Sequence, residues 1–286
     1  LRLLYPGPGT ARPYSLLPHA LLPRRLAPRR WWHAPLGRPV VVPFEGSIAA
    51  HLGEVFGMPI ETVVHVRPAR RANRKPILEA FSGGRRIAFV KIGDTAASGR
   101  LVTNEAAALK RLAELPLKSV VAPSVLYHGR WRDLPVLALS PLPVTRGKVT
   151  EELLLSAVRE IAGTGGPVAA WHGDLSPWNV APSGDGRLLV WDWERYEVGV
   201  PYGFDAVPHP FQRALRRMGP PEAARCCVER AVRVLAPLGL SAAQARQTAI
   251  RYLIALADRH AADGHEPLGP PETWLNPTVD EQEMLT

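Results

Sequence analysis

The chain has 286 residues, of which 46% are hydrophobic and 21% are charged, and its formal net charge is +9. These values are typical of a globular protein with one large domain or two lobes. Pro, Arg and Gly interrupt every apolar run before the roughly 20 residues that a membrane helix needs, so we expect no membrane partner. Cys226 and Cys227 are adjacent in a helix-like stretch, which favours free thiols and a cytoplasmic location.

The positive charge is concentrated at the beginning of the chain. Residues 1 to 75 hold 12 of the 35 Lys and Arg residues but only 3 of the 26 Asp and Glu residues. No duplex-binding helix with interleaved aromatic residues is visible there, so a nucleic-acid partner is not expected, although salt-sensitive binding through this segment stays an alternative. Repeated Pro and paired Arg predict that residues 1 to 45 form an Arg/Pro-rich, mostly irregular arm.

The next part of the chain, residues 46 to 139, has the pattern of a small β-rich lobe. Ser47 is a plausible cap for an amphipathic helix that follows it. Three β-rich runs and a strand-like run with a helix between them predict a small antiparallel sheet. The predicted elements are a helix over 47–57, strands over 62–66, 76–81 and 86–92, a helix over 100–115 and a strand over 134–139.

Residues 140 to 286 are expected to form a second, mainly helical lobe. The pattern predicts a helix over 149–163, a hairpin over 179–192 and three helices within 208–262, separated by Gly and Pro. Strands early in the chain and helices late in the chain indicate an α+β protein.

The strongest chemical signal lies in residues 171–179 and 191–194. If Ala181 pairs with Arg187 across the turn between them, the hairpin gathers Asp174, Asn179 and Asp192 at its open end. Oxygen ligands such as Asn179 and Asp192 suit Mg²⁺, and Asp174 is placed to accept or orient a hydroxyl proton. This division of roles is that of phosphoryl transfer. A chance occurrence of three such residues in a turn-rich loop is the alternative, and the second segment argues against it.

His172-Gly173-Asp174 with Asn179, and the Val190–Trp193 segment, resemble the catalytic and metal-binding segments of aminoglycoside phosphotransferases and choline kinase-like enzymes. The resemblance implies a two-lobed protein-kinase-like fold, with a small antiparallel sheet in the N-lobe and a mainly helical C-lobe. It implies that Asp174 is the catalytic base, that Asn179 and Asp192 bind Mg²⁺ and that His172 is a scaffold residue. Asp205 looks like the family residue that braces the catalytic loop, although a lone Asp could equally cap a helix.

Two further residues are expected on apolar faces. Lys91 shares a strand face with Ile87 and Phe89, and Glu105 lies on the apolar stripe of the following helix. Each charge needs a partner there. The two resemble the kinase ion pair that positions the α- and β-phosphates of the nucleotide. A structural salt bridge or a Lys that reaches solvent is the alternative.

The nucleotide contacts are completed by two segments. The resemblance places a purine-binding hinge at residues 137–142, which assigns Ala138 and Ser140 to cofactor binding. Where protein kinases have a Gly-rich loop, this chain has a basic loop that could bind phosphates. An equal alternative is that this loop is only a charged hairpin tip in contact with solvent. The candidate residues of this loop are Arg70, Arg71, Asn73 and Arg74.

These expectations describe a small-molecule kinase that transfers the γ-phosphate of ATP or GTP to a hydroxyl of a small acceptor, with Mg²⁺. Residues 196 to 286 have only a slight acidic excess, which disfavours a polycationic antibiotic as the acceptor. The alternative is a nucleotide-binding pseudokinase or regulatory module. The short stretch between Pro143 and His172, which holds one predicted helix, supports it, and the retained Asp174, Asn179 and Asp192 oppose it.

Overall fold

The computed structural model describes residues 3–6, 11–17, 25–33, 37–65, 74–145 and 147–283. The chain divides into two compact units. The first unit is Leu1–Ala106 with Ser124–Pro141, and the second is Ala107–Pro123 with Leu142–Thr286. Within the described ranges, no helix combines the length and the apolar character needed to cross a membrane.

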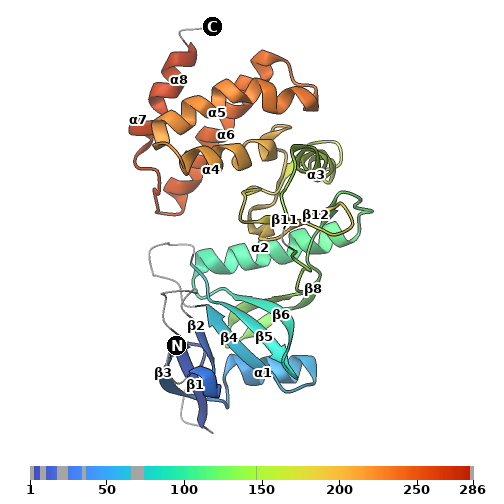
Figure 1. Cartoon of the computed structure of the whole chain (residues 1–286), viewed down its shortest axis with the longest axis vertical. Helices are drawn as coiled ribbons and strands as arrows, with labels where there is room; N and C mark the ends of the chain where they lie inside the picture. The colour runs from blue at the N-terminus through green and yellow to red at the C-terminus, as the bar shows by residue number, and fades with distance from the viewer. Residues whose placement is uncertain are drawn as a thin grey trace. The chain divides into compact units, whose positions relative to one another are not determined.

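The first unit contains one eight-stranded sheet in which all neighbouring strands are antiparallel (Figure 1). The order across the sheet is β3-β1-β2-β4-β5-β6-β9-β8. The strands are β1 (Ala11–Leu17), β2 (Arg25–Pro28), β3 (Arg38–Pro43), β4 (Glu61–His65), β5 (Ile77–Ser82), β6 (Arg85–Ile92), β8 (Val125–Trp131) and β9 (Leu134–Leu139).

The described part of the first 45 residues contains three strands, so the expectation of a mostly irregular arm is wrong for this part. Strands β1, β2 and β3 come from this stretch and extend the sheet beyond β4. Pro39 and Pro43 lie in the edge strand β3, where a missing N–H removes no ladder bond from a further strand. Tyr14 and Val42 point into the same buried core as the rest of the sheet. The predicted small sheet is therefore a larger one in the structure.

Helix α1 (Ile48–Phe56) packs on this sheet and confirms the predicted helix. The Ser47 hydroxyl accepts a hydrogen bond from the N–H of Ala50 at 3.2 Å, which caps the first turn. Ile48 and Leu52 are fully buried in the core that the sheet residues form. Gly57, with φ of 64°, ends the helix in a left-handed conformation.

The second unit is mainly helical, as predicted (Figure 1). Helix α2 (Ala96–Ala113) begins in the first unit and ends in the second. The first four helices after α2 match the four predicted helices. The helices are α3 (Glu151–Gly163), α4 (Pro208–Leu215), α5 (Pro220–Leu235), α6 (Ala242–Ala262), α7 (Pro271–Trp274) and α8 (Asn276–Glu283), with the 3-10 turns η1 (Trp31–His33) in the first unit and η2 (Trp193–Arg195), η3 (Phe204–Ala206) and η4 (Ala236–Leu238) in the second.

Two small sheets accompany these helices. One consists of β11 (Val180–Pro182) and β12 (Leu188–Val190) with β7 (Val120–Val121), which runs parallel to β12. The other pairs β10 (Ala170–Trp171) with β13 (Glu197–Val198).

The hairpin of β11 and β12 forms, but its register differs from the expected one. Ala181 pairs with Leu189, and not with Arg187. Arg187 belongs to the turn, because its oxygen accepts from the N–H of Ser183 at 2.8 Å and its side chain binds Asp185. A longer turn shifts every pair by two residues and leaves the face of each side chain unchanged.

A cluster of aromatic side chains packs around β10, the strand that leads into residues 172–179. The ring of Trp171 in β10 contacts the rings of Phe204 and Tyr252, at centroid distances of 5.3 and 6.4 Å. Tyr252 of α6 also contacts Phe211 of α4. The cluster therefore ties β10 to η3 and to α6, and through these to the second unit's core.

Candidate active site

His172 links the two segments of the motif. It is fully buried and follows β10 directly. Its Nδ1 accepts a hydrogen bond from the N–H of Asp174 at 3.1 Å, so this nitrogen carries no proton. Its Nε2 therefore carries the proton and donates to the backbone oxygen of Trp191 at 3.1 Å. Both ring nitrogens of His172 therefore form hydrogen bonds with backbone groups.

Asp205 of η3 holds the backbone of the same segment. Its carboxylate accepts hydrogen bonds from the N–H of His172 at 2.6 Å and from the N–H of Gly173 at 3.2 Å. The side chain is buried, and this burial raises the pKa of Asp205 to about 7, while the two backbone hydrogen bonds oppose the rise. The carboxylate therefore satisfies two N–H groups that would otherwise be unpaired inside the protein.

Gly173 is required where it stands. Its φ is +84°, a left-handed backbone conformation that residues other than glycine rarely adopt. A Cβ atom at this position would collide with the backbone oxygen of Arg195. The turn between His172 and Asp174 thus packs directly on the segment after Asp192.

Asp174 has hydrogen-bond partners on both carboxylate oxygens. The Ser176 hydroxyl donates to Oδ1, and the amide nitrogen of Asn179 donates to Oδ2 at 2.9 Å. Burial is the largest cause that raises the pKa of Asp174 to about 6, and the negative charge of Asp192 adds to the rise. The Ser176 hydrogen bond and the positive charge of Arg259 act in the opposite direction. A carboxylate with a pKa of about 6 is mostly ionised at neutral pH.

Asn179 is oriented by the same contacts. Its amide nitrogen donates to the backbone oxygen of Asp174 at 3.0 Å as well as to the carboxylate. Because these partners only accept, the nitrogen faces them and the amide oxygen faces the other way. The N–H of Trp191 donates to the backbone oxygen of Asn179 at 3.1 Å, which brings the two segments together at the open end of the hairpin.

Asp192 follows β12 in a strained conformation. Its φ is 71°, in the left-handed region, and it is one of three non-glycine residues with positive φ in the described ranges. Such a backbone costs about 1 kcal/mol or more, and strain of this kind is concentrated at functional sites. The conformation lets the chain turn from β12 directly into η2.

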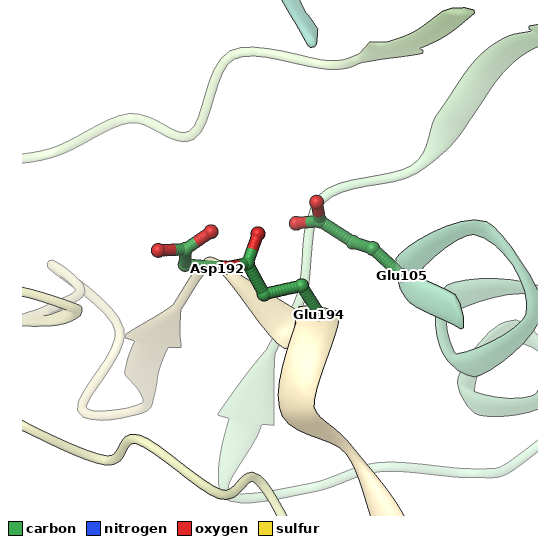
Figure 2. Close-up of side chains that lie close together, drawn as sticks. All are labelled: Glu105, Asp192 and Glu194. Atoms are coloured by element: carbon green, nitrogen blue, oxygen red, sulfur yellow. The ribbon is translucent and has the colours of Figure 1, made fainter. Parts of the chain in front are cut away.

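Glu194 brings a second acidic group to this turn. Figure 2 shows Asp192 and Glu194 on the same short segment, and each offers a carboxylate oxygen within 4.8 Å of the other. Glu194 is buried. Carboxylate oxygens are the donors that Mg²⁺ prefers, and Asp192 and Glu194 offer two carboxylates at this spacing. The residues present therefore fit a divalent cation.

In the first unit, Lys91 and Glu105 form an ion pair. The Nζ of Lys91 lies 2.7 and 2.6 Å from the two carboxylate oxygens of Glu105. Lys91 comes from β6. Glu105 extends from α2 (Figure 2). Both side chains are buried. The sequence pattern required a partner for each of these two charges, and in the structure Lys91 and Glu105 pair with each other.

The expected hinge residues lie at the end of β9. Ala138 is inside the sheet, paired with Val90 on one side and with Tyr127 on the other. The N–H of Ser140 donates to the backbone oxygen of Ser124 at 2.9 Å, and the Ser140 hydroxyl accepts from the N–H of Ser124 at 2.8 Å. A purine bound to the Ser140 N–H would therefore replace an existing hydrogen bond.

Of the four candidate residues in the basic loop, only Arg74 is described, and it is exposed. Arg70, Arg71 and Asn73 lie outside the described residues.

Three residues of the site were not anticipated from the sequence. Ser176 and Glu194 lie within the motif segments, and only their contacts with Asp174 and Asp192 distinguish them. Arg259 lies on α6, and its Nη1 donates to the backbone oxygen of Gly173 at 2.5 Å. A basic residue in the last turn of a helix is common, because it complements the helix dipole, so the sequence carried no signal for this contact.

No family model matches the sequence, and no curated protein matches it. Solved structures do match. The putative fructosamine-3-kinase of Haemophilus somnus 129PT aligns over 82% of this chain and 96% of its own, with a TM-score of 0.50 and 12% identity. The chain has a protein-kinase-like fold.

Two other kinase structures align less closely. The APH(2")-IIa complex with streptomycin and ATP aligns over 68% of this chain and 96% of its own, with a TM-score of 0.38 and 12% identity. WbdD, a bifunctional kinase-methyltransferase, aligns over 78% of this chain and 50% of its own, with a TM-score of 0.38 and 14% identity. The predicted α+β class is confirmed, with an antiparallel sheet in the N-terminal part and a mainly helical C-terminal part.

Proposed function

We propose that this chain is a phosphotransferase that moves the γ-phosphate of ATP or GTP to a hydroxyl of a small-molecule acceptor. The observation that carries the proposal is the grouping of Asp174, Asn179 and Asp192 at the open end of one hairpin, on a protein-kinase-like fold. The fold alone would not decide the function, because one fold supports many activities. The residues at the hairpin end support phosphoryl transfer.

Asp174 is proposed as the residue that receives the acceptor proton. The acceptor oxygen bonds to the γ-phosphorus, the bond from that phosphorus to the bridging oxygen breaks, and the nucleoside diphosphate leaves with the electron pair. The acceptor hydroxyl loses its proton to the Asp174 carboxylate. Ser176 and Asn179 hold that carboxylate in one orientation through the hydrogen bonds to its two oxygens.

Asn179 and Asp192 would hold Mg²⁺, and Glu194 adds a further carboxylate beside Asp192. When bound, the cation would neutralise charge on the phosphates. Lys91 is proposed to bind the α- and β-phosphates, with Glu105 fixing the direction of its ammonium group. Ala138, Ser140 and Arg74 stay proposed contacts of the nucleotide.

A thermal-shift titration tests the nucleotide site without knowledge of the acceptor. ATP and GTP are added with and without Mg²⁺, because a ligand that binds the folded state raises the melting temperature. A Mg²⁺-dependent rise that is absent in Asp192→Ala is expected. Absence of a rise with either nucleotide in the unaltered chain would argue against the proposal.

Turnover separates the enzyme from its rival, a nucleotide-binding pseudokinase or regulatory module. Release of ADP is measured in the presence of a library of hydroxyl-bearing metabolites, with Asp174→Asn as the comparison. An active kinase loses turnover in this variant and keeps the Mg²⁺–nucleotide shift. A chain that binds nucleotide but turns over no acceptor, and in which Asp174→Asn changes nothing, is the regulatory module.

A further inference from the structure

The backbone of Gly173 is held from both sides. On one side, its N–H donates to the carboxylate of Asp205. On the other, its oxygen accepts a hydrogen bond from the Nη1 of Arg259 at 2.5 Å. The N–H of Gly173 belongs to the peptide after His172 and its oxygen to the peptide before Asp174, so the Arg259 bond holds the peptide that leads into the proposed base and the Asp205 bond holds the one before it.

The guanidinium of Arg259 packs against the Trp171 ring and is partly buried. Its central carbon is 5.4 Å from the centroid of the Trp171 ring, within the range of a cation–π contact. Its Nη2 is buried, and no hydrogen-bond partner for it occurs in the described part of the chain. A buried donor without a partner lowers stability. Complementing the dipole of α6 does not require this burial, because an exposed Arg would do the same.

A second contact ties the same end of α6 to the segment that carries Asp192. Asp263 is the C-cap of α6, and its N–H donates to the backbone oxygen of Arg259 at 2.9 Å. Its carboxylate accepts a hydrogen bond from the Arg195 guanidinium, and Arg195 ends the η2 turn that begins after Asp192. The end of α6 therefore binds both segments of the proposed site.

We propose that Arg259 is a positioning residue of the reaction, which sets the place of the Asp174 carboxylate through the carbonyl of Gly173. This inference rests on the proposed function. Within the described residues, Arg259 forms no hydrogen bond to the Asp174 carboxylate; its hydrogen bond is to the oxygen of the Gly173 peptide. Its loss therefore lowers kcat and leaves the affinity for Mg²⁺–ATP unchanged.

The test compares Arg259→Gln with Arg246→Gln, an exposed Arg on the same helix. Misplacement of a reacting group by about 1 Å can cost about a hundredfold in rate, so we expect a fall in kcat of about tenfold to a hundredfold in Arg259→Gln. We expect the Kd of Mg²⁺–ATP and the kcat of Arg246→Gln to be unchanged. Equal kcat in the two variants would overturn the inference.

Rescue distinguishes positioning from general destabilisation. In Arg259→Gly, added guanidinium at millimolar concentration is expected to restore part of kcat, and Arg259→Lys is expected to retain part of it, because each supplies a cationic donor for the Gly173 oxygen. A fall in kcat that follows a fall in melting temperature, and that guanidinium does not reverse, would contradict the role.

Amide hydrogen exchange tests, independently of turnover, whether Arg259 holds the Gly173 segment in place. In Arg259→Gln, exchange should accelerate in residues 171–176 and stay unchanged in the sheet of the first unit. If the unaltered chain binds no nucleotide, the proposed function fails, and the exchange result still decides whether Arg259 holds the segment. Unchanged exchange in residues 171–176 would refute the inference even where the chain is an active kinase.

Discussion

The Lys91 ammonium donates to both carboxylate oxygens of Glu105, at 2.7 and 2.6 Å. The Glu105 side chain is fully buried and that of Lys91 is 10% exposed. The desolvation of two such charges offsets much of their attraction, so a buried pair of this kind is weak evidence for net stabilisation.

Removing one partner of this pair should be far more costly than removing both. Lys91→Met leaves the Glu105 carboxylate without its cation, and we expect it to lower the free energy of unfolding by about 3 kcal/mol or more. The double variant Lys91→Met/Glu105→Leu should recover a large part of that loss, because no uncompensated charge stays buried. Urea denaturation of the single and double variants measures both values, and strict additivity would contradict the expectation.

Gly173 and Gly184 offer a matched pair of glycine-to-alanine changes. At Gly173, the left-handed φ and the close approach to the Arg195 oxygen should make Ala destabilising by about 1–2 kcal/mol or more. Gly184 lies in the turn between β11 and β12, where an added Cβ would meet no atom within 4 Å and where φ is not left-handed. Ala there should be neutral or stabilising by about 0.5 kcal/mol. Melting temperatures and ADP release distinguish the two, and comparable losses would count against the packing of the Gly173 turn.

Glu79 should make the first unit sensitive to acid. This buried carboxylate on β5 binds the Nε2 of His65 at 2.9 Å and the guanidinium of Arg86 at 2.8 Å. The hydrogen bond from His65 is the first of the causes that lower the pKa of Glu79 to about 2, from an ordinary value of 4.5. A lowered folded-state pKa adds stability above pH 4.5, and that stability is lost as the pH falls from 4.5 through 2.

The corresponding measurement is unfolding by urea between pH 6 and pH 2, in the unaltered chain and in Glu79→Gln. The variant should be less stable at pH 6, and its stability should depend less on pH below 4.5. Glu151→Gln serves as the control, because Glu151 is exposed in the first turn of α3. Parallel pH profiles for Glu79→Gln and the unaltered chain would exclude this role of Glu79.

The sequence by itself determined the local features of this protein. Helix α1 begins after Ser47 because a cap and an apolar period are local properties, and β9 occupies the predicted residues because its apolar run has clear limits. It also indicated that Lys91 and Glu105 need partners, because a charge on an apolar face is visible from spacing alone. The segments that carry Asp174 and Asp192 were found from their residue pattern and from the turn between them.

The tertiary structure decided what depends on residues far apart in the chain. Strands β1, β2 and β3 were hidden by Pro and Arg, and only pairing with β4 and with one another makes them strands. The turn contacts of Arg187 set the hairpin register. Arg259 reaches Gly173 only because α6 folds back on the motif. A sequence pattern reports periods and caps, whereas pairing and burial are properties of the packed chain.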